Sequence, residues 1–254
     1  MVEQIQTILS QIRILPRRLS LLTPGVRATV PMLRGVWGAA LHDLAPEAYC
    51  SVFLGQGAAH ERVPAFVLRP APPSAEDNPA LDWILIGDGL NYDSVLLRAW
   101  DIASGMGLGP ARRRFHIRAC RGLDPAGNLL SAMANSGGWR LFEAFWPLPG
   151  PPDSTPCRLR FPAPLRLLRL HRLIEQPTLA DVVVAALRRL EAFLDVVRYS
   201  GRQKTELEMR GVSGYLDLPD GPGPLWPLLA AAQWLHLGKG AVVGMGQLVV
   251  APLP

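Results

Sequence analysis

Lysine is nearly missing from this chain of 254 residues, because Lys204 and Lys239 are the only two and every other basic side chain is an arginine. The net charge of +5 and the pI of about 9.6 favour polyanionic partners but do not define a fold. Arginine grips phosphate with a planar fork of donors and stacks on bases, which suits RNA. A high-GC codon bias would enrich the same residue, so the placement of the arginines matters more than their number.

Cysteine is also scarce. Cys50, Cys120 and Cys157 lie far apart, with no pair at metal-ligand or redox spacing, and their odd number indicates a reducing cytoplasm. No apolar run approaches the roughly 20 residues that a membrane-spanning helix needs, and arginines interrupt the first 20 residues where a signal peptide would be apolar. The sequence predicts a cytoplasmic protein with no membrane partner. The five scattered histidines argue against a zinc site, and no cofactor is expected.

Apolar periodicity predicts two halves with a similar order of elements. The first half has a strand within residues 5–22, a helix opening at Pro31, strands at 49–54, 63–68 and 81–86, a helix at 91–104 and an alternating strand at 112–120. The second half has a strand within 158–170, a helix at 178–198, a hairpin of 205–210 with 212–218, a helix at 224–236 and a strand at 247–251. A Pro/Gly-rich linker at 147–156 separates them. This order predicts an α+β fold of two tandem ferredoxin-like (RRM-like, βαββαβ) domains, 1–146 and 157–254.

Glycines are concentrated near the C-terminus. Gly238, Gly240, Gly244 and Gly246 follow a predicted helix and precede a predicted strand, with Lys239 among them. Such a loop lets the backbone pass close to another group and frees N–H groups for an anion, with a tight structural turn as the alternative. It is neither a Walker A loop, since no Ser or Thr follows the lysine, nor a Rossmann fingerprint, which needs a strand before it and a helix after it.

Residues 235–246 resemble the C-terminal glycine-rich signature of the RAMP superfamily. More narrowly, they resemble that of the CRISPR repeat-RNA endoribonucleases (Cas6 family), where an H-x-G-K-G…G-x-G segment closes the second ferredoxin-like domain. Residues 34–41, RGVWGAAL, are similar to the R-G-x-x-G-x-x-L pattern of that family's first helix. Further pieces fit at 64–70, 86–87, 105–109, 200–203 and 211–214. The resemblance spans most of the chain and implies an endoribonuclease that cleaves CRISPR repeat transcripts.

For this family the resemblance implies metal-independent cleavage, in which a 2′-hydroxyl attacks the adjacent phosphate and leaves a cyclic phosphate and a 5′-hydroxyl. That reaction needs a base, an acid and a cation near the phosphorane. His42, at the end of the first predicted helix beside a stripe of small residues, is the first candidate for the base. If His42 is not the base, the active site would depend on Arg34, Arg27 and Arg202 as transition-state cations.

Contacts with RNA are expected from three groups of residues. Arg112, Arg114, His116 and Arg118 share one face of the predicted alternating strand. The other two groups are the basic residues of and after the long helix, and the glycine loop. They comprise Arg188, Arg189, Arg198, Lys204, Gly238, Lys239, Gly240, Gly244 and Gly246. For the arginines of the helix, the alternative is a solvent-exposed surface that does not bind RNA.

The expected partner is the hairpin of a CRISPR repeat RNA, which the protein could retain as crRNA, and other CRISPR effector subunits are further candidates. Two other functions stay open. A non-catalytic RAMP subunit would bind and cap crRNA without cutting it. A regulatory ferredoxin-like protein would bind a small anion and show no salt-dependent affinity for RNA.

Overall fold

The computed structural model describes residues 2–55, 63–72, 79–130, 140–141, 155–193 and 210–253. These residues form two compact units. We call the first the N-unit, made of residues 13–56 and 62–140, and the second the C-unit, made mainly of residues 1–12 and 141–254. The helix α1 (Val2–Leu9) thus belongs to the C-unit, although it precedes every element of the N-unit.

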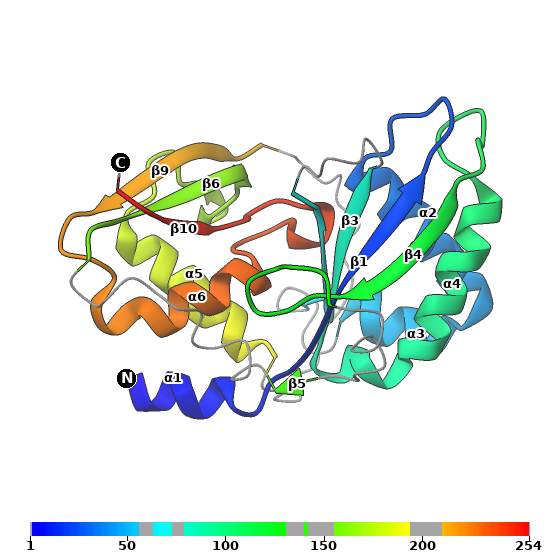
Figure 1. Ribbon diagram of the computed structural model, residues 1–254. Helices are drawn as coiled ribbons and strands as arrows, with labels where there is room; N and C mark the ends of the chain where they lie inside the picture. The colour runs from blue at the N-terminus through cyan, green and yellow to red at the C-terminus, as the bar shows by residue number, and fades with distance from the viewer. Residues whose placement is uncertain are drawn as a thin grey trace. The chain divides into compact units, whose positions relative to one another are not determined.

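The N-unit contains an antiparallel sheet with helices on one face (Figure 1). Its elements in chain order are β1 (Arg13–Leu22), α2 (Val30–Leu44), α3 (Pro46–Tyr49), a π-helical turn (Cys50–Leu54), β2 (Phe66–Pro70), β3 (Ala80–Ile86), a 3-10 turn (Gly87–Tyr92), α4 (Asp93–Met106), β4 (His116–Gly122) and β5 (Arg140–Leu141). The strand order is β2-β3-β1-β4, with β5 also paired to β1. This βαββαβ order, with the first and third strands in the middle, is that of a ferredoxin-like fold.

Aromatic packing joins the N-unit helices to the sheet. Trp37 of α2 is fully buried and stacks on Trp100 of α4, with 4.8 Å between the ring centroids. Its ring also meets Trp83 of β3 edge-on at 5.5 Å, and its indole N–H donates to the Leu96 carbonyl at 3.2 Å. Aromatic pairs in these geometries stabilise a core beyond the area that they bury. Both long helices are therefore fixed against the same face of the sheet.

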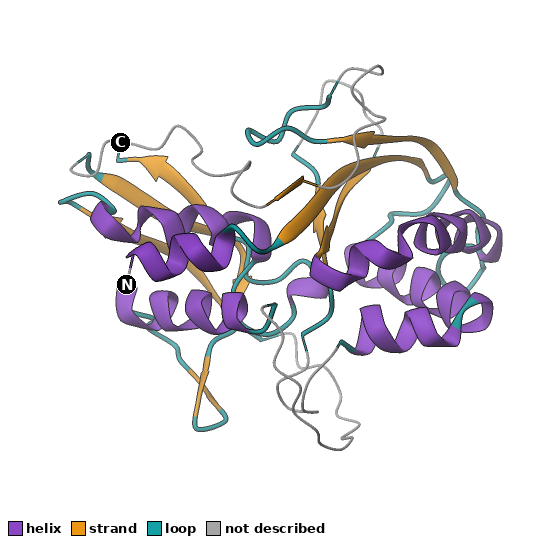
Figure 2. Ribbon diagram, turned by 90° about the horizontal axis from the view of Figure 1, so that it is seen from below, coloured by secondary structure: helices purple, strands orange, loops and turns teal. Residues whose placement is uncertain are grey.

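The C-unit also has an antiparallel sheet, covered on one face by α1, α5 and α6, which lie side by side (Figure 2). Its elements are β6 (Cys157–Leu165), β7 (Leu168–Arg169), β8 (Arg172–Leu173), α5 (Leu179–Glu191), β9 (Val212–Leu218), a 3-10 turn (Gly223–Leu225), α6 (Trp226–Leu235), a 3-10 turn (Ala241–Val243) and β10 (Val249–Pro252). The order β10-β6-β9 places the first strand of this unit in the middle. A capping box of Thr178 and Asp181 begins α5, as the sequence predicts.

Several predicted elements differ from the observed ones. Residues 49–54 form helical turns instead of a strand, because the helical spacing of Tyr49 and Phe53 stacks their rings at 5.2 Å and brings Phe53 against Trp37. A short run of apolar and aromatic residues cannot distinguish a strand from a buried helical segment. The strand predicted to begin at Arg112 begins at His116, since Arg112 occupies a turn with a φ of 46°. The first strand of the predicted hairpin, and most of the predicted linker, lie outside the described residues.

Candidate active site and nucleic-acid interface

The last turn of α2 carries His42 at the surface of the N-unit. Thr29 caps the first turn of this helix and Pro31 occupies its N-terminal end, where the missing N–H costs nothing. The His42 side chain is 63% exposed, its Nδ1 lies 3.4 Å from an Asp43 carboxylate oxygen, and its ring meets the Tyr49 ring edge-on at 5.1 Å. An imidazole in this position is accessible to a large substrate.

The predicted small-residue stripe beside His42 is only partly open. Gly35 and Ala39 are exposed, and a Cβ at Gly35 would have no atom within 4 Å. Gly38, however, is buried, and a Cβ there would lie 2.7 Å from the Phe53 ring. Gly38 therefore serves core packing, whereas Gly35 and Ala39 leave space for a substrate backbone to approach the helix.

Arg34 lies on a different side of α2 from His42, and its side chain approaches the aromatic residues Tyr49 and Phe53. Its guanidinium is 5.3 Å from the centroid of the Phe53 ring, and its Nε has no hydrogen-bond partner in the described part of the chain. Burial lowers the pKa of Arg34, and the nearby Tyr49 partly offsets this effect. Tyr49 thus contacts His42 and acts electrostatically on Arg34, so His42, Tyr49 and Arg34 form one group, which we call the α2 site.

No sequence pattern indicated Tyr49, because the break between α2 and α3 removes any regular spacing from His42. Arg27 is exposed before α2, and among the described residues no contact connects it to the α2 site. Arg202 lies outside the described residues, as do Arg198 and Lys204. Two of the four candidate catalytic residues are therefore brought together.

The predicted basic strand is a turn followed by a strand. Arg112 and Arg114 precede β4, and His116 and Arg118 lie within it, where they alternate with the less exposed Ile117 and Ala119. All four predicted contact residues are exposed, so their side chains are accessible even though only two of them share a strand face.

On α5, Arg188 is exposed but Arg189 is not, which removes the basis for predicting that Arg189 binds RNA. Arg189 is only 7% exposed, and its Nε donates to the Leu235 carbonyl at the end of α6, at 3.0 Å. Its guanidinium lies 4.8 Å from the Phe193 ring, and one terminal nitrogen has no hydrogen-bond partner within the described residues. Burial lowers the pKa of Arg189 to about 9. Its role is to cap α6 from the core.

We expect Arg189→Met to leave the free energy of unfolding unchanged or to raise it by up to about 2 kcal/mol, because an apolar side chain of similar volume removes an uncompensated buried charge. The folded-state pKa lies below the unfolded one, so the unfavourable contribution of Arg189 should diminish as pH rises through about 9. Urea denaturation at pH 7 and pH 9.5 tests this, with Arg188→Met as the exposed control. A clear loss of stability in the Arg189 variant would contradict it.

Five backbone N–H groups of the glycine loop already donate hydrogen bonds to carbonyls of the protein. The N–H groups of Lys239 and Gly246 donate to the carbonyls of Arg166 and Pro164 at the end of β6, at 3.1 and 2.9 Å. Other N–H groups in the loop donate to carbonyls within it: those of Val243 and Met245 to Gly240, and that of Gly244 to Ala241. The expectation that the glycines free N–H groups for an anion is therefore wrong for these five groups. The side chain of Lys239 is exposed.

Packing explains why the loop needs glycine. Gly238 and Gly246 have φ values of 66° and 69°, and a Cβ would lie 2.3 Å from the Arg166 carbonyl oxygen at the first position and 1.9 Å from the Leu237 carbonyl oxygen at the second. Only glycine tolerates both the backbone conformation and the close approach. His236 is buried in the same turn, with its Nδ1 2.9 Å from the Met245 carbonyl oxygen, so it belongs to the packing of this loop.

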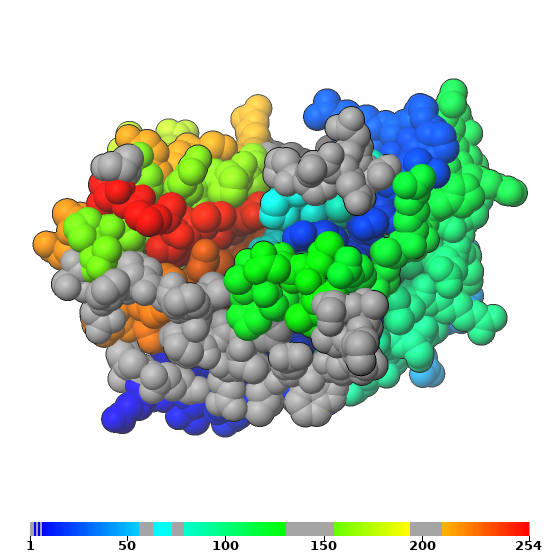
Figure 3. All heavy atoms as spheres, viewed as in Figure 1, coloured from blue at the N-terminus to red at the C-terminus, as the bar shows by residue number. Residues whose placement is uncertain are grey.

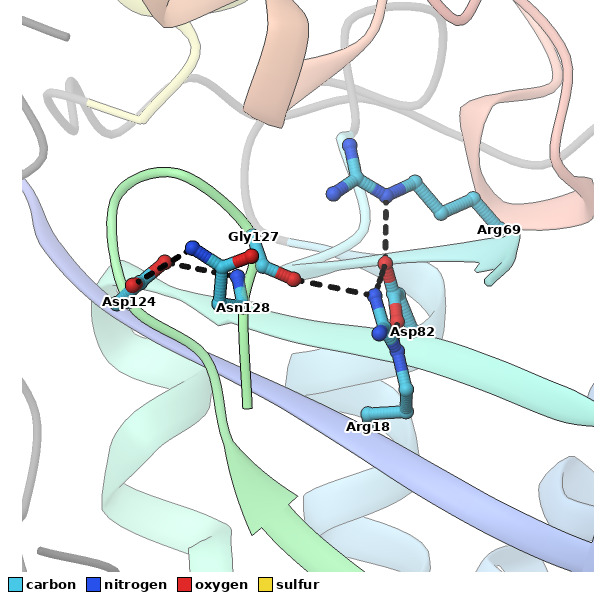
Figure 4. A network of polar contacts seen from close by, with 6 residues as sticks. All are labelled: Arg18, Arg69, Asp82, Asp124, Gly127 and Asn128. Carbon is cyan, nitrogen blue, oxygen red and sulfur yellow. Dashed lines mark hydrogen bonds and ion pairs between the residues drawn. The ribbon is translucent and has the colours of Figure 1, made fainter. Parts of the chain in front are cut away.

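A row of charged residues crosses the face of the N-unit sheet that points away from the helices. Asp82 of β3 is paired in register with Arg69 of β2 and with Arg18 of β1, which is paired in turn with Arg121 of β4. Asp82 is fully buried; it accepts hydrogen bonds from Arg18 Nε at 2.6 Å and from Arg69 Nε at 3.2 Å (Figure 4). Burial lowers the pKa of Arg69, and Asp82 offsets part of that effect. We call these four residues the sheet row.

The sheet row also holds the segment that follows β4. Arg18 donates to the Gly127 carbonyl at 3.4 Å, and Arg121 donates to the Leu130 carbonyl at 2.7 Å. Gly127 lies in a turn that Asp124 and Asn128 close. The Asn128 N–H donates to an Asp124 carboxylate oxygen at 2.8 Å (Figure 4). These arginines are thus used to position a loop, a role that composition could not reveal.

The described ranges contain no group of three or more His, Cys, Asp or Glu residues arranged to hold a metal ion. None of their helices has both the length and the apolar character needed to cross a bilayer.

Comparison with known proteins gives one family. Residues 155–248 match the family model of the CRISPR-associated endoribonuclease Cas6. No curated protein matches the chain. A solved Cas6 product complex is 16% identical with a TM-score of 0.58, covering 94% of this chain and 100% of that one. A Thermus thermophilus Cas6 is 15% identical with a TM-score of 0.55, over 95% and 99% of the two chains. A chain of a Cas6-RT-Cas1–Cas2 complex is 13% identical with a TM-score of 0.56, over 97% of this chain and 47% of that one.

At these identities the structural likeness shows the fold, and it extends over nearly the whole chain. The family model matches the sequence of most of the C-unit, including the glycine loop from Gly238 to Gly246. The predicted α+β class is confirmed, and the predicted resemblance to the Cas6 family is confirmed over residues 155–248. Residues 155–248 thus match the Cas6 family model, and nearly the whole chain has the fold of solved Cas6 structures.

Proposed function

We propose that the protein is a metal-independent endoribonuclease that cuts CRISPR repeat transcripts into guide RNAs. The observation that carries the proposal is the α2 site, where an exposed histidine lies against Tyr49, with Arg34 directed toward the same ring system. Support comes from the solved Cas6 structures of the same fold, which include a product complex and a substrate-mimic complex.

In the proposed reaction, the 2′-oxygen bonds to the adjacent phosphorus and the bond from phosphorus to the 5′-oxygen breaks. The 2′-hydroxyl gives its proton to a base, and the leaving 5′-oxygen takes a proton from an acid. His42 serves as the base, because an imidazole exchanges protons near neutral pH and because this one is open to substrate. Tyr49, whose ring meets that of His42, serves as the proton donor for the leaving oxygen, and Arg34 supplies positive charge for the phosphorane.

The exposed basic residues bind the repeat hairpin in this proposal. Arg112, Arg114, His116 and Arg118 offer phosphate contacts on the N-unit, and Arg188 and Lys239 offer them on the C-unit. The structure of Cas6 within a Cas6-RT-Cas1–Cas2 complex supports association with other CRISPR proteins as a further role. A protein that only bound and capped crRNA would need these contacts but not the α2 site.

We expect the wild-type protein to cleave a labelled repeat RNA from its own locus at full rate in EDTA. The upstream product should end in a cyclic phosphate and resist enzymatic tailing until the phosphate is removed. The matched control is the same RNA with a single 2′-deoxy nucleotide at the cut, which should bind equally and stay intact. Tight binding without cleavage would support the non-catalytic alternative, and cleavage that requires added Mg²⁺ would contradict the proposed chemistry.

A further inference from the structure

The C-unit sheet has one face that its helices do not cover. Along β6, Cys157, Leu159 and Phe161 are buried, whereas Arg158 and Arg160 point the other way. In Figure 3 the residues of β6, β9 and β10 lie next to one another at the molecular surface. The uncovered face therefore carries the alternate side chains of these strands.

An exposed tyrosine dominates this face. Tyr215 of β9 is 60% exposed and is paired in register with Arg160 of β6. The guanidinium of Arg158 lies over one side of its ring, 3.8 Å from the centroid. Nearby on β9 are the small residue Ser213, which is exposed, and Gly214, which has no side chain. One side of the ring is thus stacked by an arginine, and the ring remains largely open.

The charges around the ring are fixed and mostly positive. Asp217, the register partner of Arg158, accepts two hydrogen bonds from its guanidinium at 2.6 and 2.9 Å. The hydrogen bond from Arg158 lowers the pKa of Asp217, so the pair stays ionised at neutral pH. Arg160 is exposed and has no hydrogen bond or ion pair among the described residues. Asp217 thus holds Arg158 on the ring, while Arg160 retains its charge for a ligand.

We propose that this face binds unpaired nucleotides of RNA, with one base stacked on Tyr215 and an adjacent phosphate on Arg160. An exposed aromatic ring with arginines on an open antiparallel sheet suits single strands, because every base has a stacking face and phosphate neutralises the cations. A duplex could not occupy it in the same way, since its bases are already stacked. The proposal goes beyond cleavage: it gives the protein a second RNA contact, for the single-stranded sequence next to a repeat, separate from the α2 site.

The test measures binding of a fluorescent twelve-nucleotide oligouridylate by anisotropy at two salt concentrations. We expect Tyr215→Ala to weaken binding about 5- to 100-fold, the range for losing one stacked base. Tyr215→Phe should retain affinity within about twofold, since the ring does the stacking, and Arg160→Ala should weaken binding and reduce its salt dependence. Val184→Ala, an exposed apolar residue on α5, is the control and should behave as wild type.

A second measurement locates the contact directly. An oligouridylate containing 5-iodouridine, photocrosslinked to the wild-type protein, should modify Tyr215 when the adduct is mapped by mass spectrometry. Equal affinity of wild type and Tyr215→Ala, or crosslinks confined to other residues, would overturn the proposal. Cleavage of an isolated repeat hairpin should be unaffected in Tyr215→Ala, so failure here is distinguishable from failure of the proposed endonuclease.

Discussion

His42→Ala is expected to slow single-turnover cleavage of repeat RNA by about 10²- to 10⁴-fold while leaving RNA affinity within about twofold of wild type. The loss would follow from removing the proposed proton acceptor for the attacking 2′-hydroxyl. The fold should survive, because the His42 side chain is exposed and makes only an edge contact with Tyr49 and a 3.4 Å contact with Asp43. Gel-based cleavage under enzyme excess, with binding measured on the same RNA, gives both quantities.

The matched control is His171→Asn, which changes an exposed histidine in the turn between β7 and β8. Asparagine tolerates the φ of 64° at that position, so the turn should be kept. This variant should cleave like wild type. If His42→Ala cleaves at the wild-type rate, the base is another group, and Arg34→Ala then becomes the variant that tests electrostatic stabilisation at the α2 site.

Asp82→Ala is expected to reduce the free energy of unfolding by about 3–5 kcal/mol, the typical cost of removing one partner from a buried ion pair. Two largely buried arginines, Arg18 and Arg69, would lose the carboxylate between them. Asp82→Asn keeps the shape but not the charge and should be nearly as unstable. The midpoint of urea denaturation measures the loss.

The control for Asp82 is Asp88→Ala, which removes the partner of Arg13 in an ion pair of 3.6 Å. The Asp88 side chain is 51% exposed, so solvent screens the pair and the expected cost is about 0–1 kcal/mol. Similar midpoints for the two alanine variants would contradict the view that the sheet row is an internal stabilising network.

Much of the architecture could be predicted because it depends on local patterns. The helix opening at Pro31, the buried strand at 81–86 and the capping box of Thr178 and Asp181 each have a signal within a few residues. The exception at 49–54 arose from a tertiary cause, since the contact of Phe53 with Trp37 selects the helical conformation. A short aromatic segment carries no local information about such a partner.

The site residues were harder to predict from the sequence, because an arginine can bind RNA, stabilise the fold or simply face solvent. Arg188 and Arg189 are neighbours in sequence, yet one faces solvent and the other caps α6 from within the core. The sheet row joins residues of four strands, which only the pairing register brings together. Tyr215 gave no signal either, because a single exposed tyrosine is recognisable only when the strand face around it is known.

The backbone contacts at Gly238 and Gly246 bear on how the proposed activity could be lost in evolution. Since a methyl group at either position would collide with a carbonyl oxygen, a descendant without the proposed nuclease activity would still have to retain these glycines in order to fold. Selection on the loop is then selection on foldability. We therefore expect relatives without this activity to keep the glycine signature and to diverge first at the position equivalent to His42, whose exposed side chain contributes little to folding.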